Sequence, residues 1–130
     1  GFKVLGEKNG FTQSHQTVVN VLDYGDGGKI EADLEKANII VNRQLIPGDI
    51  KAKRHYMHPG GIRLGTSEVT RLGMKESEMG QIASLIKSVI VDNKDTKNIA
   101  KQIAEFRKTY QNTQYCFDNK LGAYEYVKLR

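Results

Sequence analysis

The stretch MKESEMGQIASLIKSVIVD, residues 74–92, places its apolar side chains at helical spacing on a single face. A helix of this kind must bury that face against another element. The predicted face comprises Met79, Ile82, Ala83, Ile86, Val89 and Ile90. A second stripe follows a predicted N-cap at Asp95 and comprises Ile99, Ile103, Phe106 and Tyr110. Both stripes are typical of core packing rather than of cofactor contacts, so we expect helices packed on another layer.

Before these helices, three β-rich runs are separated by glycine and proline breaks. The runs are QTVVNVLDY, IIVNRQL and GIRLGT, residues 16–24, 39–45 and 61–66. Between the first two, residues 29–38 form a helical pattern that carries Ile30, Leu34 and Ala37. The order β-α-β-β-α-α predicts an α/β (α+β) fold, with a small open, mostly antiparallel sheet of about three strands packed on helices. No repeat or linker interrupts residues 1–130, so we expect one domain.

The composition is that of an ordinary globular protein. The 130 residues are 38% apolar and 27% charged, which argues against a disordered chain, and no apolar run approaches the roughly 20 residues of a membrane-spanning helix. The chain begins GFKVLGEKNG, with neither a methionine nor a signal-peptide layout, and we expect it to be a piece of a longer protein. A single cysteine, Cys116, predicts a reducing compartment, the cytoplasm. Its aromatic neighbours Tyr115 and Phe117 are typical of a buried, inert thiol.

The net charge of +5 leaves the kind of partner open. The basic residues are spread along the chain, and their one local cluster is KAKRHY, residues 51–56. No nucleic-acid motif accompanies this cluster. A solvated basic loop is therefore favoured over a nucleic-acid interface, while a small anionic ligand would also fit. We expect neither nucleic acid nor a membrane as a partner.

The sequence carries no complete catalytic or metal-binding motif. GGIRLG fails the dinucleotide pattern because its first two glycines are adjacent, and GDGGKI fails the phosphate loop because Ile30 follows the lysine. Asp23 and Asp26 lack the spacing of a calcium loop. His55 and His58 lack an obvious third zinc ligand. We therefore expect no catalytic residue, cofactor-binding residue or metal ligand in this chain.

Arg63 stands in the middle of GGIRLG, where a strand interior would favour an apolar side chain. Flanking glycines allow other groups to approach the strand closely, so the guanidinium could point into a cleft. Arginine binds a carboxylate through two parallel hydrogen bonds, which fix its orientation as well as neutralising its charge. A second interpretation stays open, in which Arg63 is a surface residue at a strand end, paired with an acid such as Glu68.

Three segments occur in a familiar order: SHQTVVNV, ANIIVNRQLIPGD and GGIRLGTSEVTRLGMKESEM. Together they resemble the C-terminal small domain of serine hydroxymethyltransferases, which are pyridoxal-phosphate enzymes of the aspartate aminotransferase fold class, fold type I. The third segment is the most specific. The resemblance covers residues 1–92 well and residues 93–130 loosely, as a variable helical tail. It implies that the large, cofactor-binding domain lies outside these 130 residues.

The resemblance implies a role for Arg63, because the arginine of the family's GIR segment binds the carboxylate of the substrate, serine or glycine. The Schiff-base lysine and the phosphate-binding residues belong to the family's large domain, so this chain alone would be inert. The full enzyme would cleave serine to glycine by a retro-aldol reaction and pass the one-carbon unit to a reduced folate or a modified pterin. A homodimer is also implied. Gly61 and Gly65 would shape the backbone beside the site, and Thr66 and Arg71 would be structural.

The chain departs from the usual family pattern at several positions. The family's serine before GIR is replaced here by the pair Gly60-Gly61, and its TPA by TSE, residues 66–68. The second arginine of the family's TRRG segment is replaced by Leu72. In the loop where many bacterial members have Pro-Asn-Asp or Pro-Phe-Asp, this chain has Pro47-Gly48-Asp49. These departures indicate a divergent member that uses a modified pterin or another aldehyde acceptor. Two alternatives stay open: a related pyridoxal-phosphate-dependent threonine or β-hydroxy amino acid aldolase, and a standalone non-catalytic binding module with a basic, anion-binding face.

Overall fold

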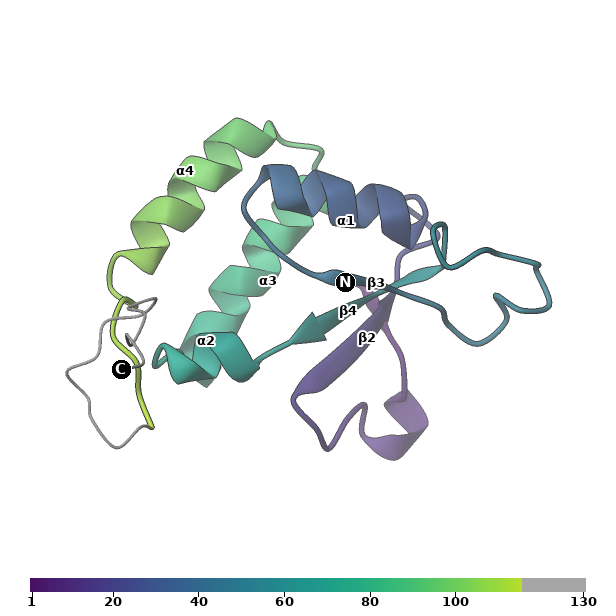
Figure 1. Cartoon of the computed structure of the whole chain (residues 1–130), viewed down its shortest axis with the longest axis horizontal. Helices are drawn as coiled ribbons and strands as arrows, with labels where there is room; N and C mark the ends of the chain where they lie inside the picture. Colours follow the sequence, from purple (N-terminus) through teal and green to yellow (C-terminus); the bar gives the residue numbers. More distant parts are fainter. Residues whose placement is uncertain (116–130) are drawn as a thin grey trace, which may run out of the picture.

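The computed structural model describes residues 1–115 and consists of a four-stranded sheet with helices on one side (Figure 1). The strands are β1 (Lys3–Val4), β2 (Gln16–Asn20), β3 (Asn42–Gln44) and β4 (Gly61–Gly65). Their order is β1-β2-β4-β3, and every neighbouring pair is antiparallel. The predicted mixed α/β class and antiparallel sheet are confirmed. The two-residue β1 was not predicted, because so short a strand has no periodicity and depends on pairing with β2.

The helices are α1 (Gly27–Lys36), α2 (Ser67–Arg71), α3 (Glu76–Ile90) and α4 (Thr96–Arg107), with a 3₁₀ turn η1 (Glu7–Asn9) after β1. Helix α1 begins two residues before the predicted start, because the Asp26 side chain accepts a hydrogen bond from the Lys29 N–H at 2.8 Å. Helix α2 was not predicted, since five residues are too few to show an apolar stripe. Among the described residues, no helix is long and apolar enough to cross a membrane.

The two long amphipathic helices are confirmed, with one error in each predicted stripe. Ala83 does not belong to the buried face of α3, and Tyr110 lies beyond the end of α4 at Arg107. Ile86, Val89 and Ile90 of α3 are buried, but Ala83 is exposed. The stripe instead runs through Ile82 and Leu85, which pack against the core. The error in α3 arose because Ala83 lies at the edge of the apolar stripe, where periodicity alone does not settle burial.

Helix α4 follows its predicted cap. The Asp95 side chain accepts a hydrogen bond from the Lys97 N–H at 3.3 Å. Ile99 and Ile103 are buried in the core, while Phe106 and Tyr110 are half-buried, with ring centroids 5.4 Å apart. The predicted division into a core and a variable tail over residues 93–130 stays a prediction, and its last part, with Cys116, lies outside the described residues.

Alternation along β4 separates a packed face of the sheet from an uncovered one. Ile62 is buried in the core and Leu64 packs against it, on the side where α1, α3 and α4 lie (Figure 1). Because successive strand residues point to opposite faces, Gly61, Arg63 and Gly65 point to the other side. Among residues 1–115, no helix packs on that side of β4 (Figure 1). The fold therefore presents Arg63 on the face that no described helix covers, here called the uncovered face, although the Ile46 side chain lies over its Gly61 end.

Candidate functional site

Arg63 lies at the centre of the uncovered face. It is the middle residue of β4 and is directly opposite Val18 on β2 and Asn42 on β3. The next residues of β4 on this face are Gly61 and Gly65, which carry no side chains. A Cβ atom at Gly65 would meet no atom within 4 Å, so the surface beside the guanidinium is open there.

Gly61 has a different role from Gly65. A Cβ atom at Gly61 would overlap the Ile46 side chain, and its own carbonyl oxygen leaves no room for a Cβ atom at Gly27. Glycine at position 61 is therefore required by packing of β4 against the segment after β3, and the close approach of α1 to β4 requires glycine at position 27. The family resemblance implied that both glycines lie beside the site, and the structure distinguishes a packing glycine from an exposed one.

The Arg63 guanidinium has an amide partner and no acidic one. Its Nη2 donates a hydrogen bond to the side-chain oxygen of Asn42 at 3.4 Å. It forms no ion pair with any acidic side chain of residues 1–115. Glu68, the acid suggested by the surface interpretation, instead binds Arg71 through two hydrogen bonds of 2.8 and 2.9 Å. Arg63 is thus a half-buried cation whose charge is not neutralised within the described residues.

Sequence reasoning missed Asn42 as the partner of Arg63. The two residues are 21 positions apart and meet only because β3 and β4 pair in a register that aligns them. A sequence signal was present, because Asn42 is a polar residue at the end of an otherwise apolar run, IIVN. It could be interpreted only once the register was known.

A buried aspartate closes the loop that joins β3 to β4. Asp49 is 2% exposed, and one of its carboxylate oxygens accepts hydrogen bonds from the Ile46 N–H at 2.9 Å and the Gly60 N–H at 2.8 Å. A Cβ atom at Gly60 would lie 2.8 Å from the other carboxylate oxygen. Gly48 has φ of +99°, a conformation that favours glycine. The departures at Gly48 and Gly60 therefore have structural explanations within this loop.

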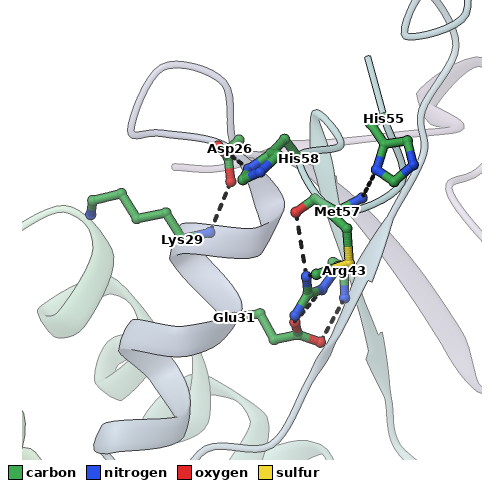
Figure 2. A network of polar contacts seen from close by, with 7 residues as sticks. All are labelled: Asp26, Lys29, Glu31, Arg43, His55, Met57 and His58. Atoms are coloured by element: carbon green, nitrogen blue, oxygen red, sulfur yellow. Dashed lines mark hydrogen bonds and ion pairs between the residues drawn. The ribbon is translucent and has the colours of Figure 1, made fainter.

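A polar network ties the same loop to α1 (Figure 2). The Arg43 side chain pairs with Glu31 of α1 and also donates to the Met57 carbonyl oxygen at 3.4 Å. The loop and α1 meet a second time where His58 Nδ1 lies 3.1 Å from a carboxylate oxygen of Asp26. The hydrogen bond from the Lys29 N–H, and then the contact with His58, hold the pKa of Asp26 below its ordinary value.

These contacts give the two loop histidines separate partners. His58 faces Asp26, whereas His55 Nδ1 accepts a hydrogen bond from the Met57 N–H at 3.3 Å. No group of three potential metal ligands occurs in the part of the chain that the structure describes. Residues 51–56 are exposed, as expected for a solvated basic loop.

The described residues do not fit a phosphate-bearing cofactor such as pyridoxal phosphate. Every lysine among residues 1–115 is exposed, so none occupies an enclosed pocket of the kind a Schiff-base lysine needs. Two hollows on the surface of the described residues are shallow, with volumes of about 330 and 310 Å³, and Arg63 lines neither. What the uncovered face offers, within residues 1–115, is the Arg63 guanidinium, a cation without an acidic partner that is suited to a carboxylate.

Comparison with known proteins matches this architecture and its motifs. Residues 1–86 match the family model described as serine hydroxymethyltransferase. The chain is 73% identical over 130 residues to a serine hydroxymethyltransferase of Nitrosopumilus maritimus, and 70% identical to that of Cenarchaeum symbiosum. Both alignments cover 100% of this chain, which spans about 30% of the length of these curated relatives.

A solved structure shows the same fold. The L-threonine transaldolase of Pseudomonas fluorescens, in its internal aldimine state, superposes with a TM-score of 0.76 at 32% sequence identity. The superposition covers 93% of this chain and 27% of that one. The matched region is thus a minor part of a longer protein in each of these comparisons.

Proposed function

The chain belongs to the serine hydroxymethyltransferase family, and we propose that it is the C-terminal small domain of a pyridoxal-phosphate-dependent serine hydroxymethyltransferase. The whole enzyme interconverts serine and glycine by retro-aldol cleavage and passes the one-carbon unit to a reduced pterin. Within this domain, Arg63 binds the carboxylate of the amino acid. The observation that carries the proposal is the half-buried Arg63, which has an amide partner but no acidic one on the uncovered face of the sheet.

The chemistry of the guanidinium supports a carboxylate as its ligand. A cation that is half removed from water is stabilised by a charged partner, and a hydrogen bond to a charged group contributes about 1.5–3 kcal/mol. A guanidinium can offer two parallel N–H groups that match the two oxygens of a carboxylate. Arg63 would thereby fix both the position and the orientation of the amino acid relative to the bond that breaks.

The cofactor is assigned to the rest of the polypeptide. Pyridoxal phosphate, when bound, supplies an electron sink for the carbanion that forms when a bond to the substrate α-carbon breaks. The exposed lysines and shallow hollows of residues 1–115 argue against a cofactor site here. The internal aldimine state of the similar transaldolase and the family membership support this cofactor. In this arrangement the uncovered face of the sheet turns toward the large domain, and the small domain alone is inert.

A second candidate activity is threonine or β-hydroxy amino acid aldol chemistry. It is favoured by the structural similarity to the L-threonine transaldolase. Both activities need the amino-acid carboxylate to be anchored, so the role of Arg63 is the same in each. Retro-aldol assays with serine and with threonine, each with and without a reduced folate or a modified pterin, distinguish them. The identity with relatives named serine hydroxymethyltransferase supports the first.

Other features of the whole protein also remain proposals. The family resemblance supports a homodimer of the full-length enzyme. The cytoplasmic location depends on the single cysteine, Cys116, which lies outside the described residues. Neither nucleic acid nor a membrane enters the proposed activity. The standalone binding module stays the alternative if the gene encodes no large domain.

The proposal is tested on the full-length protein loaded with pyridoxal phosphate. Glycine is titrated while the visible absorption of the cofactor is followed, for the wild type and for Arg63→Ala. Loss of a bidentate charged contact of about 3 kcal/mol predicts a rise of about 100-fold in the glycine dissociation constant.

The matched control is Lys101→Ala, which removes one positive charge from an exposed position on α4. Its glycine affinity is expected to equal that of the wild type. Equal affinities for wild type and Arg63→Ala would overturn the assignment of Arg63. Absence of any spectral response to glycine in the wild type would overturn the proposed activity itself.

A further inference from the structure

Asn42 is placed to control how Arg63 presents its guanidinium. It is the first residue of β3 and lies directly opposite Arg63 on β4, so the two side chains share the uncovered face. Its side-chain oxygen accepts the 3.4 Å hydrogen bond from Arg63 Nη2. Asn42 is exposed, and its side chain makes no other hydrogen bond within residues 1–115. Its amide is therefore not committed to holding the fold together.

The other neighbours of Arg63 give its side chain no polar support. Val18, its partner on β2, is apolar. Gly61 and Gly65, which follow on the same face, have no side chains. Within the described part of the chain, Asn42 is thus the sole hydrogen-bond partner of the Arg63 side chain. Without Asn42, the guanidinium would be free to turn about its several rotatable bonds.

We propose that Asn42 is a positioning residue that selects the edge of the Arg63 guanidinium available to the substrate carboxylate. A guanidinium has two edges that can bind a carboxylate bidentately, one made by Nη1 and Nη2 and one by Nε and Nη2. Nη2 contributes one hydrogen to each edge. When Asn42 accepts one of these hydrogens, one complete edge remains for the ligand. This inference rests on the proposed function, because it assumes that Arg63 binds the carboxylate.

Asn42→Asp gives the sharpest perturbation. It places a carboxylate where the amide oxygen now accepts from Nη2, so the protein itself supplies the anion that Arg63 would bind. The substrate carboxylate then competes with a tethered group at high effective concentration. We expect the dissociation constant for glycine to rise by about tenfold or more, with KM affected much more than kcat. Asn42→Ala removes only the orienting contact, and we expect about a two- to fivefold rise.

Asn20→Asp is the matched control. Asn20 lies on β2, opposite Gly61, and belongs to the same face of the sheet. Its side-chain oxygen caps a turn by accepting from the Leu22 N–H at 3.0 Å, which an aspartate can also do. The substitution therefore adds the same charge to the same face without placing it opposite Arg63. Its glycine affinity is expected to stay within about twofold of the wild type.

The experiment uses the full-length protein loaded with pyridoxal phosphate and two probes, glycine and glycinamide. Glycinamide lacks the carboxylate, so its binding does not use the bidentate contact. Asn42→Asp should weaken glycine binding and leave glycinamide binding nearly unchanged. A purely structural defect would weaken both probes alike and would overturn the proposal.

Arg63→Ala, measured in parallel, separates the positioning role of Asn42 from the carboxylate-binding role of Arg63. If Arg63→Ala weakens glycine binding and Asn42→Asp does not, Asn42 is not a positioning residue and the proposed function stands. If neither substitution weakens glycine binding, the assignment of Arg63 as the carboxylate-binding residue is wrong. If Asn20→Asp weakens glycine binding as much as Asn42→Asp, the effect is one of general charge, and the positioning role is refuted.

Discussion

Replacing Asp49 with alanine should loosen the loop between β3 and β4 without unfolding the sheet. The carboxylate is 2% exposed and accepts hydrogen bonds from the Ile46 and Gly60 N–H groups. Each N–H left buried without an acceptor costs about 1–3 kcal/mol. Loss of both therefore predicts a local destabilisation of about 2–6 kcal/mol, and the upper part of that range applies if no water enters the loop.

Hydrogen exchange measures this loss directly. Since 1.4 kcal/mol corresponds to a factor of ten, the amides of Ile46 and Gly60 should exchange at least about 30 times faster in Asp49→Ala than in the wild type. The measurement is made by mass spectrometry on peptides from residues 45–60 of the full-length protein. Asp49→Asn keeps an oxygen that can accept from both N–H groups, so most of the protection should remain.

Asp23→Ala provides a matched control for the loss of a carboxylate. The Asp23 side chain is 61% exposed and pairs with Lys3 at 3.0 Å on the surface, an interaction worth at most about 1 kcal/mol. Its removal should leave the exchange of the loop amides unchanged. If Asp49→Ala exchanged these amides at the wild-type rate, the carboxylate would not be what closes the loop.

Further predictions concern α1 and α3. The lowered pKa of Asp26 means that its charged form stabilises the fold at pH values above its ordinary pKa of 3.8, and this contribution is lost as the pH falls through the lower folded value. Asp26→Asn has no such charge to lose. Relative to its value at neutral pH, the free energy of unfolding of Asp26→Asn should therefore fall less on acidification than that of the wild type, as followed by circular dichroism. Gly80→Ala should stabilise the protein by about 0.5–1 kcal/mol, because glycine is unfavourable inside α3 and the new methyl group meets no atom within 4 Å. Gly27→Ala should destabilise it by more than about 1 kcal/mol, because the methyl group would overlap the Gly61 carbonyl oxygen. Thermal unfolding compares the two glycine variants, and a higher midpoint for Gly27→Ala than for Gly80→Ala would contradict the packing described here.

Local patterns predicted the parts of the fold that depend on neighbouring residues. The burial of Ile86, Val89 and Ile90 and the cap at Asp95 follow from helical spacing and side-chain chemistry. The pairing of β1 with β2 was not predictable in this way, because two residues carry too little pattern and the strand forms through contacts with residues 19 and 20.

The candidate site also has parts that local sequence predicted and parts that it did not. Arg63 stands out in the sequence because it is a charged residue between glycines, and the family resemblance gave it a role. Its pairing with Asn42 and its place on the uncovered face depend on strand register. The burial of Asp49 also escaped prediction, because its partners, two backbone N–H groups and the Arg54 side chain, are brought together only when the loop closes. Side-chain identity suggests chemistry, whereas tertiary pairing decides which groups meet.

The most direct test of the central claim is a crystal structure of the full-length protein with pyridoxal phosphate and glycine bound. Two nitrogen atoms of the Arg63 guanidinium are expected to lie about 2.7–2.9 Å from the two carboxylate oxygens of glycine. Asn42 is expected still to accept a hydrogen bond from Nη2. A glycine carboxylate bound by another cationic side chain, with Arg63 turned to solvent, would contradict the account.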